Sequence, residues 1–139
     1  MTGRAAVRAD VDLVRWLFEA VWSRGETDEL QQRLDPHNFH YRDGTNQLGP
    51  AELTGIVEKW RTALPDLEFR IVALVADGDL VATRCRLTGT HLGPLRGREP
   101  TGHRVDMGVM MCFRFDESGL VETWELDDIA ALEAQIDAP

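Results

Sequence analysis

The 139-residue chain has few of the side chains on which several common enzyme chemistries depend. Its only serines are Ser23, near the end of a predicted helix, and Ser118, in a predicted turn, so a serine nucleophile is not expected. Lys59 is the only lysine, and its place beside Trp60 on a predicted helix is typical of a solvated surface charge. The glycine spacing matches neither a phosphate-binding loop nor a dinucleotide fingerprint. The chemistry still available is acid–base work by carboxylates and histidines.

Long apolar runs and cysteine are also scarce, and positive charges are outnumbered by negative ones. No segment approaches the length of a membrane span, and the first ten residues carry charges where a signal peptide would be apolar. Cys85 and Cys112 fall inside predicted strands, as buried small hydrophobic residues do. The net charge is −9 and there is no basic tract, which argues against nucleic acid and anionic membranes. We expect a cytoplasmic protein, and the Arg-, Ala- and Gly-rich composition hints at a bacterial source.

Hydrophobic periodicity predicts one α+β domain over residues 1–139, with helices laid against an antiparallel sheet. The predicted helices are Val7–Trp22, Thr27–Leu34, Pro50–Leu64 and Ile129–Ile136. The predicted strands are Asn38–Arg42, Leu67–Ala76, Leu80–His91, Val105–Phe115 and Leu120–Leu126. Because it holds several glycines and prolines, the segment Leu92–Gly102 is expected to be a surface loop or a lid.

The last predicted strand contains a carboxylate where apolar residues dominate. Val121, Thr123 and Glu125 should share one face, and Glu122, Trp124 and Leu126 the other. Glu125 must therefore face water, a partner or an enclosed cavity, and we favour the cavity. There, loss of solvation would raise its pKa towards the operating pH, as a base that takes a proton from carbon requires. The alternative is a surface glutamate on an edge strand.

Two further residues are candidate catalytic groups, each with a structural alternative. Asp128 ends the same strand, but an Asp before Ile-Ala-Ala-Leu is typical of a helix N-cap. His40 could polarise a carbonyl, or could be a hydrogen-bonded strand histidine. His37 and His40 lie three residues apart without a nearby cysteine, so no metal site is expected.

Several side chains are candidates for contacting a substrate. His91 ends a strand where a pocket mouth would lie, or it is a turn residue bonded to nearby backbone. Methionines on the Val105–Phe115 strand would suit an adaptable apolar pocket, although they commonly fill cores. The candidate substrate-binding residues are Tyr41, Trp60, His91, Met107, Met111, Phe113 and Thr123.

Taken together, several segments resemble the SnoaL-like polyketide (ester) cyclases, which belong to the superfamily named after nuclear transport factor 2. The segments are Tyr41–Gly44, Trp60–Leu67, Asp77–Asp79, Gly89–Gly93, Pro100–Gly102 and Glu122–Asp128. The resemblance implies a cone-shaped α+β half-barrel, in which a curved antiparallel sheet and helices enclose a deep pocket. It also implies a homodimer formed through the outer sheet face, which an outward Trp124 would suit.

The resemblance further implies an intramolecular aldol ring closure without a metal or cofactor. A pocket carboxylate takes a proton from an activated carbon, and polar neighbours steady the enolate. By motif position that carboxylate is Glu125, where the cyclases have Asp. The family's pocket amide falls near His40, and its pocket histidine falls at Met111. The expected function is a cofactor-independent cyclase or isomerase acting on an apolar, carbonyl-bearing, polyketide-like substrate.

Two other functions remain open within this superfamily. An epoxide hydrolase similar to the limonene-epoxide type needs two carboxylates bridged by an arginine, for which Arg84 with Asp106 or Glu125 are the candidates. A non-catalytic ligand-binding or association module is the other alternative, because a fold does not dictate one function.

Overall fold

The computed structural model describes residues 7–34, 39–42 and 46–139, apart from the side chains of residues 39–42 and 46–48. The helical elements are α1 (Val11–Trp16), η1 (Leu17–Trp22), α2 (Leu30–Arg33), α3 (Pro50–Ala63) and α4 (Ile129–Asp137). The strands are β1 (Phe39–Arg42), β2 (Asn46–Leu48), β3 (Glu68–Asp77), β4 (Leu80–Thr90), β5 (Arg104–Asp116) and β6 (Gly119–Asp127). No helix within these described residues is long and apolar enough to cross a membrane.

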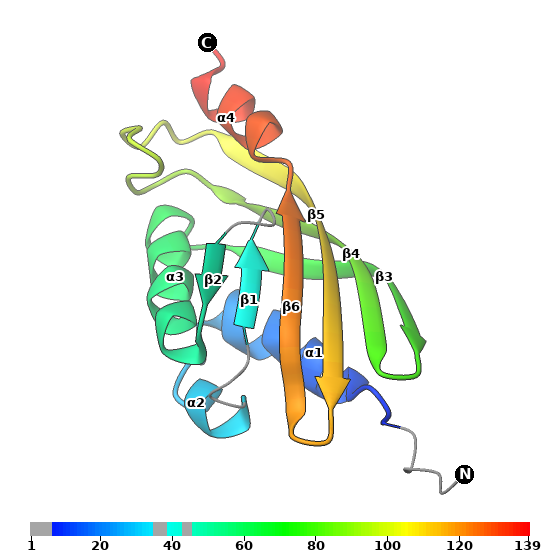
Figure 1. Cartoon of the computed structure of the whole chain (residues 1–139). Coiled ribbons are helices and arrows are strands. Elements are labelled where there is room, and N and C mark those ends of the chain that lie inside the picture. The colour runs from blue at the N-terminus through cyan, green and yellow to red at the C-terminus, as the bar shows by residue number, and fades with distance from the viewer. Residues whose placement is uncertain (1–6, 35–38, 43–45) are drawn as a thin grey trace, which may run out of the picture.

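The described strands form one six-stranded sheet in the order β2-β1-β6-β5-β4-β3. Strands β3 to β6 pair antiparallel with their neighbours, as predicted, whereas β1 runs parallel to β6. Figure 1 shows the sheet curving around the first helix, with α3 beside β2 and α4 at the end away from the β5–β6 turn. The α+β architecture with a curved sheet is therefore confirmed. The strand β2 was not predicted, because three residues are too few to show an alternating pattern.

The inner face of the sheet follows the period-two pattern of the sequence. On β4, Val81, Cys85 and Leu87 are buried, whereas Arg84 is exposed. On β5 the buried residues are Val105, Met107, Val109, Met111, Phe113 and Phe115. Because successive side chains of a strand point to opposite faces, these residues place the core between the sheet and the helices.

A register shift changes the predicted face of one residue on β6. The β5–β6 pairing is irregular between Arg114 and Phe115, and Phe115 pairs with Leu120. Leu120 is therefore buried, and Val121 is only half-buried, which corrects the prediction that Val121 shares a face with Thr123. An extra residue in one strand shifts the alternation of inward and outward side chains by one position. The amino-acid composition of the strand does not show where such an extra residue lies.

The first helix begins and winds differently from the prediction. Asp10 caps it, with Oδ1 accepting a hydrogen bond of 3.0 Å from Leu13 N, so the helix starts at Val11 and not at Val7. The segment Leu17–Trp22 is π-helical. Such wide turns are uncommon and are often found at functional sites.

The edge of the sheet at β3 is covered by the end of this helix. Ser23 Oγ accepts a hydrogen bond of 2.9 Å from Phe69 N and donates one of 3.3 Å to Phe69 O. An edge strand can pair with another chain only through backbone groups that have no hydrogen-bond partner of their own. Ser23 thereby blocks strand addition at Phe69.

The predicted surface loop, Leu92–Gly102, is fixed to α3 at its start. Leu92 N and Gly93 N both donate to Ala63 O, at 3.0 and 3.1 Å. This carbonyl belongs to the last turn of α3, where a helix leaves its C=O groups without partners inside the helix. The loop therefore completes the end of the helix.

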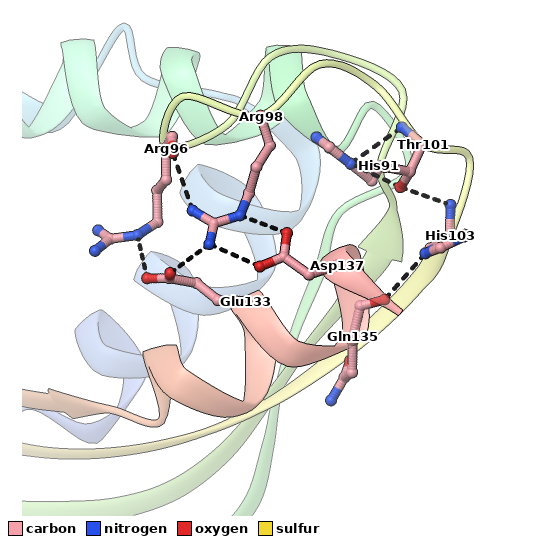
Figure 2. Close-up of polar contacts among 8 residues, drawn as sticks. All are labelled: His91, Arg96, Arg98, Thr101, His103, Glu133, Gln135 and Asp137. Atoms are coloured by element: carbon pink, nitrogen blue, oxygen red, sulfur yellow. Dashed lines mark hydrogen bonds and ion pairs between the residues drawn. The ribbon is translucent and has the colours of Figure 1, made fainter. Parts of the chain in front are cut away.

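The tip of the same loop is tied to α4 by ion pairs, as Figure 2 shows. Arg98 contacts Asp137 at 2.7 Å and Glu133 at 2.7 Å, and Arg96 contacts Glu133 at 3.0 Å. Arg98 reaches both oxygens of Asp137, which is the bidentate geometry that makes such pairs specific. The loop is thus held between two helices.

This ion pair predicts a dependence of stability on pH. Hydrogen bonding to Arg98 is the main cause that lowers the pKa of Asp137 below its ordinary value of 3.8. A carboxylate with a lowered pKa in the folded state stabilises that state above its unfolded pKa, and the contribution is lost as the pH falls through the folded pKa. The melting temperature of the wild type should therefore exceed that of Asp137→Asn near neutral pH, and the two melting temperatures should become equal by about pH 2. Thermal denaturation against pH measures this.

The matched control is Asp28→Asn, which removes an exposed carboxylate for which the described residues provide no ion pair. It should leave the melting temperature nearly unchanged at every pH. A wild-type advantage over Asp137→Asn that persists unchanged in acid would contradict the role given to the ion pair.

Candidate functional site

Glu125 lies in the interior, on the concave face of β6. Its side chain is 4% exposed, whereas its neighbours Trp124 and Leu126 are 43% and 63% exposed. The inward position of this carboxylate is therefore confirmed, and the alternative of a surface glutamate is excluded. In the sheet register Glu125 pairs with Met111, and Met111 pairs with Thr83. The catalytic role of Glu125 remains a prediction.

Two polar residues of β4 lie in the same interior. Cys85 is 0% and Thr83 is 2% exposed, and Cys85 Sγ donates a hydrogen bond of 3.1 Å to Thr83 Oγ1. Burial raises the pKa of the Cys85 thiol to about 11, Thr83 opposes this shift, and the negative charge of Glu125 adds to it. The carboxylate of Glu125 therefore lies within electrostatic reach of Cys85.

A small apolar cavity lies between the helices and the sheet. Its volume is about 20 Å³, which is room for about one water molecule. It is lined by Leu17, Phe18, Trp22, Leu34, Leu53, Met111, Phe113, Leu120 and Thr123. Three of the predicted substrate-binding residues, Met111, Phe113 and Thr123, thus meet at one place, and the π-helical segment supplies the opposite wall.

Two other predicted substrate-binding residues lie in the core without lining this cavity. Met107 on β5 is 1% exposed and pairs with Leu87 in the sheet, and Trp60 on α3 is 7% exposed. Both positions follow from the hydrophobic pattern. A contact of either residue with substrate remains a prediction.

His91 is fully buried. It lies at the base of the loop, beside Thr101, as Figure 2 shows. Thr101 N donates to His91 Nδ1 at 3.2 Å, and Thr101 Oγ1 lies 2.9 Å from the same atom. The bond from the Thr101 amide assigns the proton of the neutral ring to Nε2, which has no hydrogen-bond partner among the described residues. This geometry matches the alternative of a histidine that is bonded to nearby backbone and secures the loop.

Asp128 occupies the position that its structural alternative predicted. It is exposed and is the N-cap of α4, with Oδ1 accepting a hydrogen bond of 3.2 Å from Ala131 N. This bond satisfies an amide of the first helical turn. The structure gives Asp128 a capping role and places its side chain outside the interior.

The side chains of His40 and Tyr41 lie outside the description, and so does all of His37. The backbone of β1 pairs His40 with Thr123 and Tyr41 with Trp124. His40 is thus on the strand next to β6, and its role stays a prediction.

The residues that an epoxide hydrolase would need are separated by the sheet. Arg84 and Asp106 are exposed, and Asp106 pairs with Arg86 at 2.8 Å. Glu125 faces the interior. Arg84, Asp106 and Glu125 therefore do not form the arrangement in which one arginine bridges two carboxylates.

Thr83, which is buried in this interior, was not among the predicted candidates. The available signal was its position on β4, between the inward residues Val81 and Cys85, where a hydroxyl interrupts an apolar face. Leu17, Phe18 and Trp22 were expected only as core residues, because the pattern that buries a helix face does not show where a cavity forms.

Comparison with known structures supports the fold. AclR from Streptomyces galilaeus, described as a candidate hydroxylase, is 27% identical with a TM-score of 0.78, over 92% of this chain and 83% of AclR. IdmH from Streptomyces antibioticus, described as a candidate polyketide cyclase, is 26% identical with a TM-score of 0.79, over 91% of this chain and 96% of IdmH. A SnoaL-like protein from Jannaschia is 24% identical with a TM-score of 0.84, over 100% of this chain and 99% of that protein, which shows the fold alone.

Comparison with curated protein sequences gives no match. The family model of the SnoaL-like polyketide cyclases matches residues 12–136, which is nearly the whole chain and includes β6 with Glu125. The chain therefore belongs to the SnoaL-like polyketide cyclase family.

Proposed function

We propose that the protein is a cofactor-independent cyclase or isomerase that acts on an apolar, carbonyl-bearing, polyketide-like molecule. Its family and its likeness to IdmH, which is described as a candidate polyketide cyclase, support this class of reaction. The observation that carries the proposal is a carboxylate, Glu125, 4% exposed on the concave face next to residues that line an apolar cavity. A buried carboxylate is a stronger base than a solvated one, because burial disfavours its charged form.

In the proposed reaction Glu125 removes a proton from the carbon next to a carbonyl. The electron pair of the broken C–H bond moves into an enolate, whose carbon attacks a second carbonyl of the same molecule and forms a C–C bond. The alkoxide that results takes the proton back from Glu125. The carboxylate is thereby regenerated, and the step needs no oxidant or reductant.

Proton exchange on a simple ketone tests the first step without knowledge of the natural substrate. We choose 2-tetralone, an apolar ketone with acidic protons beside its carbonyl, in D₂O, with deuterium uptake measured by mass spectrometry. The wild-type protein should accelerate uptake above buffer and above an equal concentration of an unrelated protein. No acceleration would contradict the proposal and would favour a non-catalytic ligand-binding module.

We also propose that the protein forms a homodimer through the outer face of its sheet. Met110, Trp124 and Leu126 are 56%, 43% and 63% exposed on this face, and Met110 pairs with Leu126 in the sheet. Apolar patches of this kind are typical of protein interfaces. A groove on the same face is lined by Arg84 and Asp128 among others, so a two-fold related copy could set opposite charges against each other.

The dimer proposal predicts the effect of a charge placed in the patch. Leu126→Arg should weaken the dimer roughly 30-fold or more, the effect of losing a central contact of about 2 kcal/mol. Sedimentation equilibrium measures this. Leu92→Arg is the matched control, because Leu92 is also exposed, at 56%, but lies on the loop beside α3. A monomeric wild type, or a dimer unaffected by Leu126→Arg, would contradict the proposal.

A further inference from the structure

We infer that Thr83 donates a hydrogen bond to the substrate oxygen that becomes negative when Glu125 removes the proton, and that Cys85 positions the Thr83 hydroxyl for this. The inference rests on the proposed function, because it names a second group of the same site. Three observations support it: the position of Thr83 in the sheet, its hydrogen bond with Cys85, and the burial of the Thr83, Cys85 and Glu125 side chains.

The placement sets Thr83 and Glu125 on either side of one residue. Thr83 pairs with Met111 across β4 and β5, and Met111 pairs with Glu125 across β5 and β6. Thr83 is 2%, Met111 6% and Glu125 4% exposed, so all three belong to one row on the concave face. Met111 lines the apolar cavity. A molecule held over Met111 would therefore have a hydroxyl on one side and a carboxylate on the other.

The hydrogen bond with Cys85 determines which way the Thr83 hydroxyl can donate. Cys85 Sγ lies 3.1 Å from Thr83 Oγ1 and donates to it. Because burial raises the pKa of Cys85 to about 11, the thiol keeps its hydrogen at neutral pH and has it available for the bond to Thr83 Oγ1. A hydroxyl has one hydrogen of its own. With Cys85 occupying a lone pair of Thr83 Oγ1, that hydrogen is left for another acceptor, and no side chain of the described residues takes it.

A donor left over in an apolar interior suits a charge that develops during reaction. The enolate oxygen is such a charge, and beside Thr83, which is 2% exposed, it would lie on a face that is closed to solvent. Donors fixed in advance towards a developing oxyanion typically contribute about 10²–10³-fold to turnover. Thr83 would supply this donor from the strand opposite to that of the base.

The test compares Thr83→Val with Thr83→Ser in the 2-tetralone exchange assay. Valine keeps the shape of threonine without the hydroxyl, whereas serine keeps the hydroxyl. We expect Thr83→Val to lower kcat about 10²-fold with little change in KM, and Thr83→Ser to retain most of the activity. Cys85→Ala should lower kcat by less, because the Thr83 hydroxyl is then present but free to turn. If valine prevents folding, Thr83→Ala provides the same comparison.

The infrared S–H stretching band gives a second measurement that needs no turnover. In a Cys112→Ser background the band reports Cys85 alone, since these are the only two cysteines. Thr83→Val should move it to higher frequency, because the thiol loses its acceptor, and Thr83→Ser should leave it near the wild-type position. A band that does not move between wild type and Thr83→Val would overturn the inference.

The outcomes separate the inference from the proposed function. If wild type exchanges no faster than Glu125→Gln, the proposed function fails and the inference fails with it. If wild type is active and Thr83→Val is equally active, the inference alone fails. Activity lost in Thr83→Val and kept in Thr83→Ser, together with the infrared shift, supports it.

Discussion

Glu125→Gln should lower the rate of proton exchange about 10²–10⁴-fold, which is the contribution usual for a positioned acid or base. Glutamine has nearly the same size and can still form hydrogen bonds, but it cannot accept a proton at neutral pH. The loss should therefore appear in kcat, while binding of 2-tetralone, followed by the quenching of tryptophan fluorescence, stays within a few-fold of wild type.

The matched control for this prediction is Glu122→Gln. Glu122 lies on the same strand but is half-buried on the other face, where it pairs with Arg114. Its replacement removes the same charge from β6 without touching the interior, so exchange should remain close to wild type. Full activity in Glu125→Gln, or equal losses in both variants, would show that Glu125 is not the base.

A second consequence of the same substitution can be measured without any substrate. The charge of Glu125 is one of the causes that raise the pKa of Cys85 to about 11. Removing that charge should lower the pKa of the thiol, because an adjacent negative charge disfavours a thiolate. Thiolate absorbance against pH, in the Cys112→Ser background, checks this. An unchanged titration would mean that the carboxylate lies away from Cys85.

The inward position of Glu125 could be predicted because it follows from a local rule. In a strand the faces alternate, so Trp124 and Leu126 as outward residues leave Glu125 inward whatever the rest of the chain does. The same rule separates the buried Val81, Cys85 and Leu87 of β4 from the exposed Arg84. It failed at Val121, where a register shift displaced the alternation. Such a shift depends on how β6 pairs with β5, and the sequence of β6 alone does not determine that pairing.

The gathering of the site depends on contacts between distant parts of the chain and was not predictable in the same way. Thr83 and Glu125 are brought onto one row by the registers of β4, β5 and β6, and nothing in either strand alone specifies that register. The parallel pairing of β1 with β6 is likewise long-range. Hydrophobic periodicity also could not predict that Leu17–Trp22 is π-helical, because the same positions would face the core in an α-helix.

The glycine motif Gly89–Gly93 helped to identify the family, but the structure explains its glycines by packing. A Cβ added to Gly89 would lie 2.9 Å from Leu64 Cβ. A Cβ added to Gly93 would lie 2.4 Å from the backbone oxygen of Thr62. Both glycines let the chain approach the end of α3 closely. A family motif thus marks a contact that fixes the loop, and it need not mark a residue that touches substrate.

Gly93→Ala should therefore destabilise the protein strongly. The added methyl group would meet backbone, which cannot turn aside as a flexible side chain can, so the loop or α3 must move. That movement would weaken the bonds from the amides of residues 92 and 93 to Ala63 O. We expect a loss of about 3 kcal/mol, at the upper end of the usual range for overpacking. At about 4 °C per kcal/mol, the melting temperature should fall by roughly 10 °C in a calorimetric scan.

Gly55→Ala is the control that makes this result interpretable, since it adds the same methyl group to a glycine of the adjoining helix. Gly55 is exposed within α3, and nothing lies within 4 Å of the added Cβ. Alanine is favoured over glycine inside a helix by about 0.5–1 kcal/mol, so this variant should melt slightly above wild type. The two substitutions should thus have opposite signs. If Gly93→Ala also raised or merely maintained the melting temperature, the loop would not be packed against α3 as closely as the 2.4 Å approach requires.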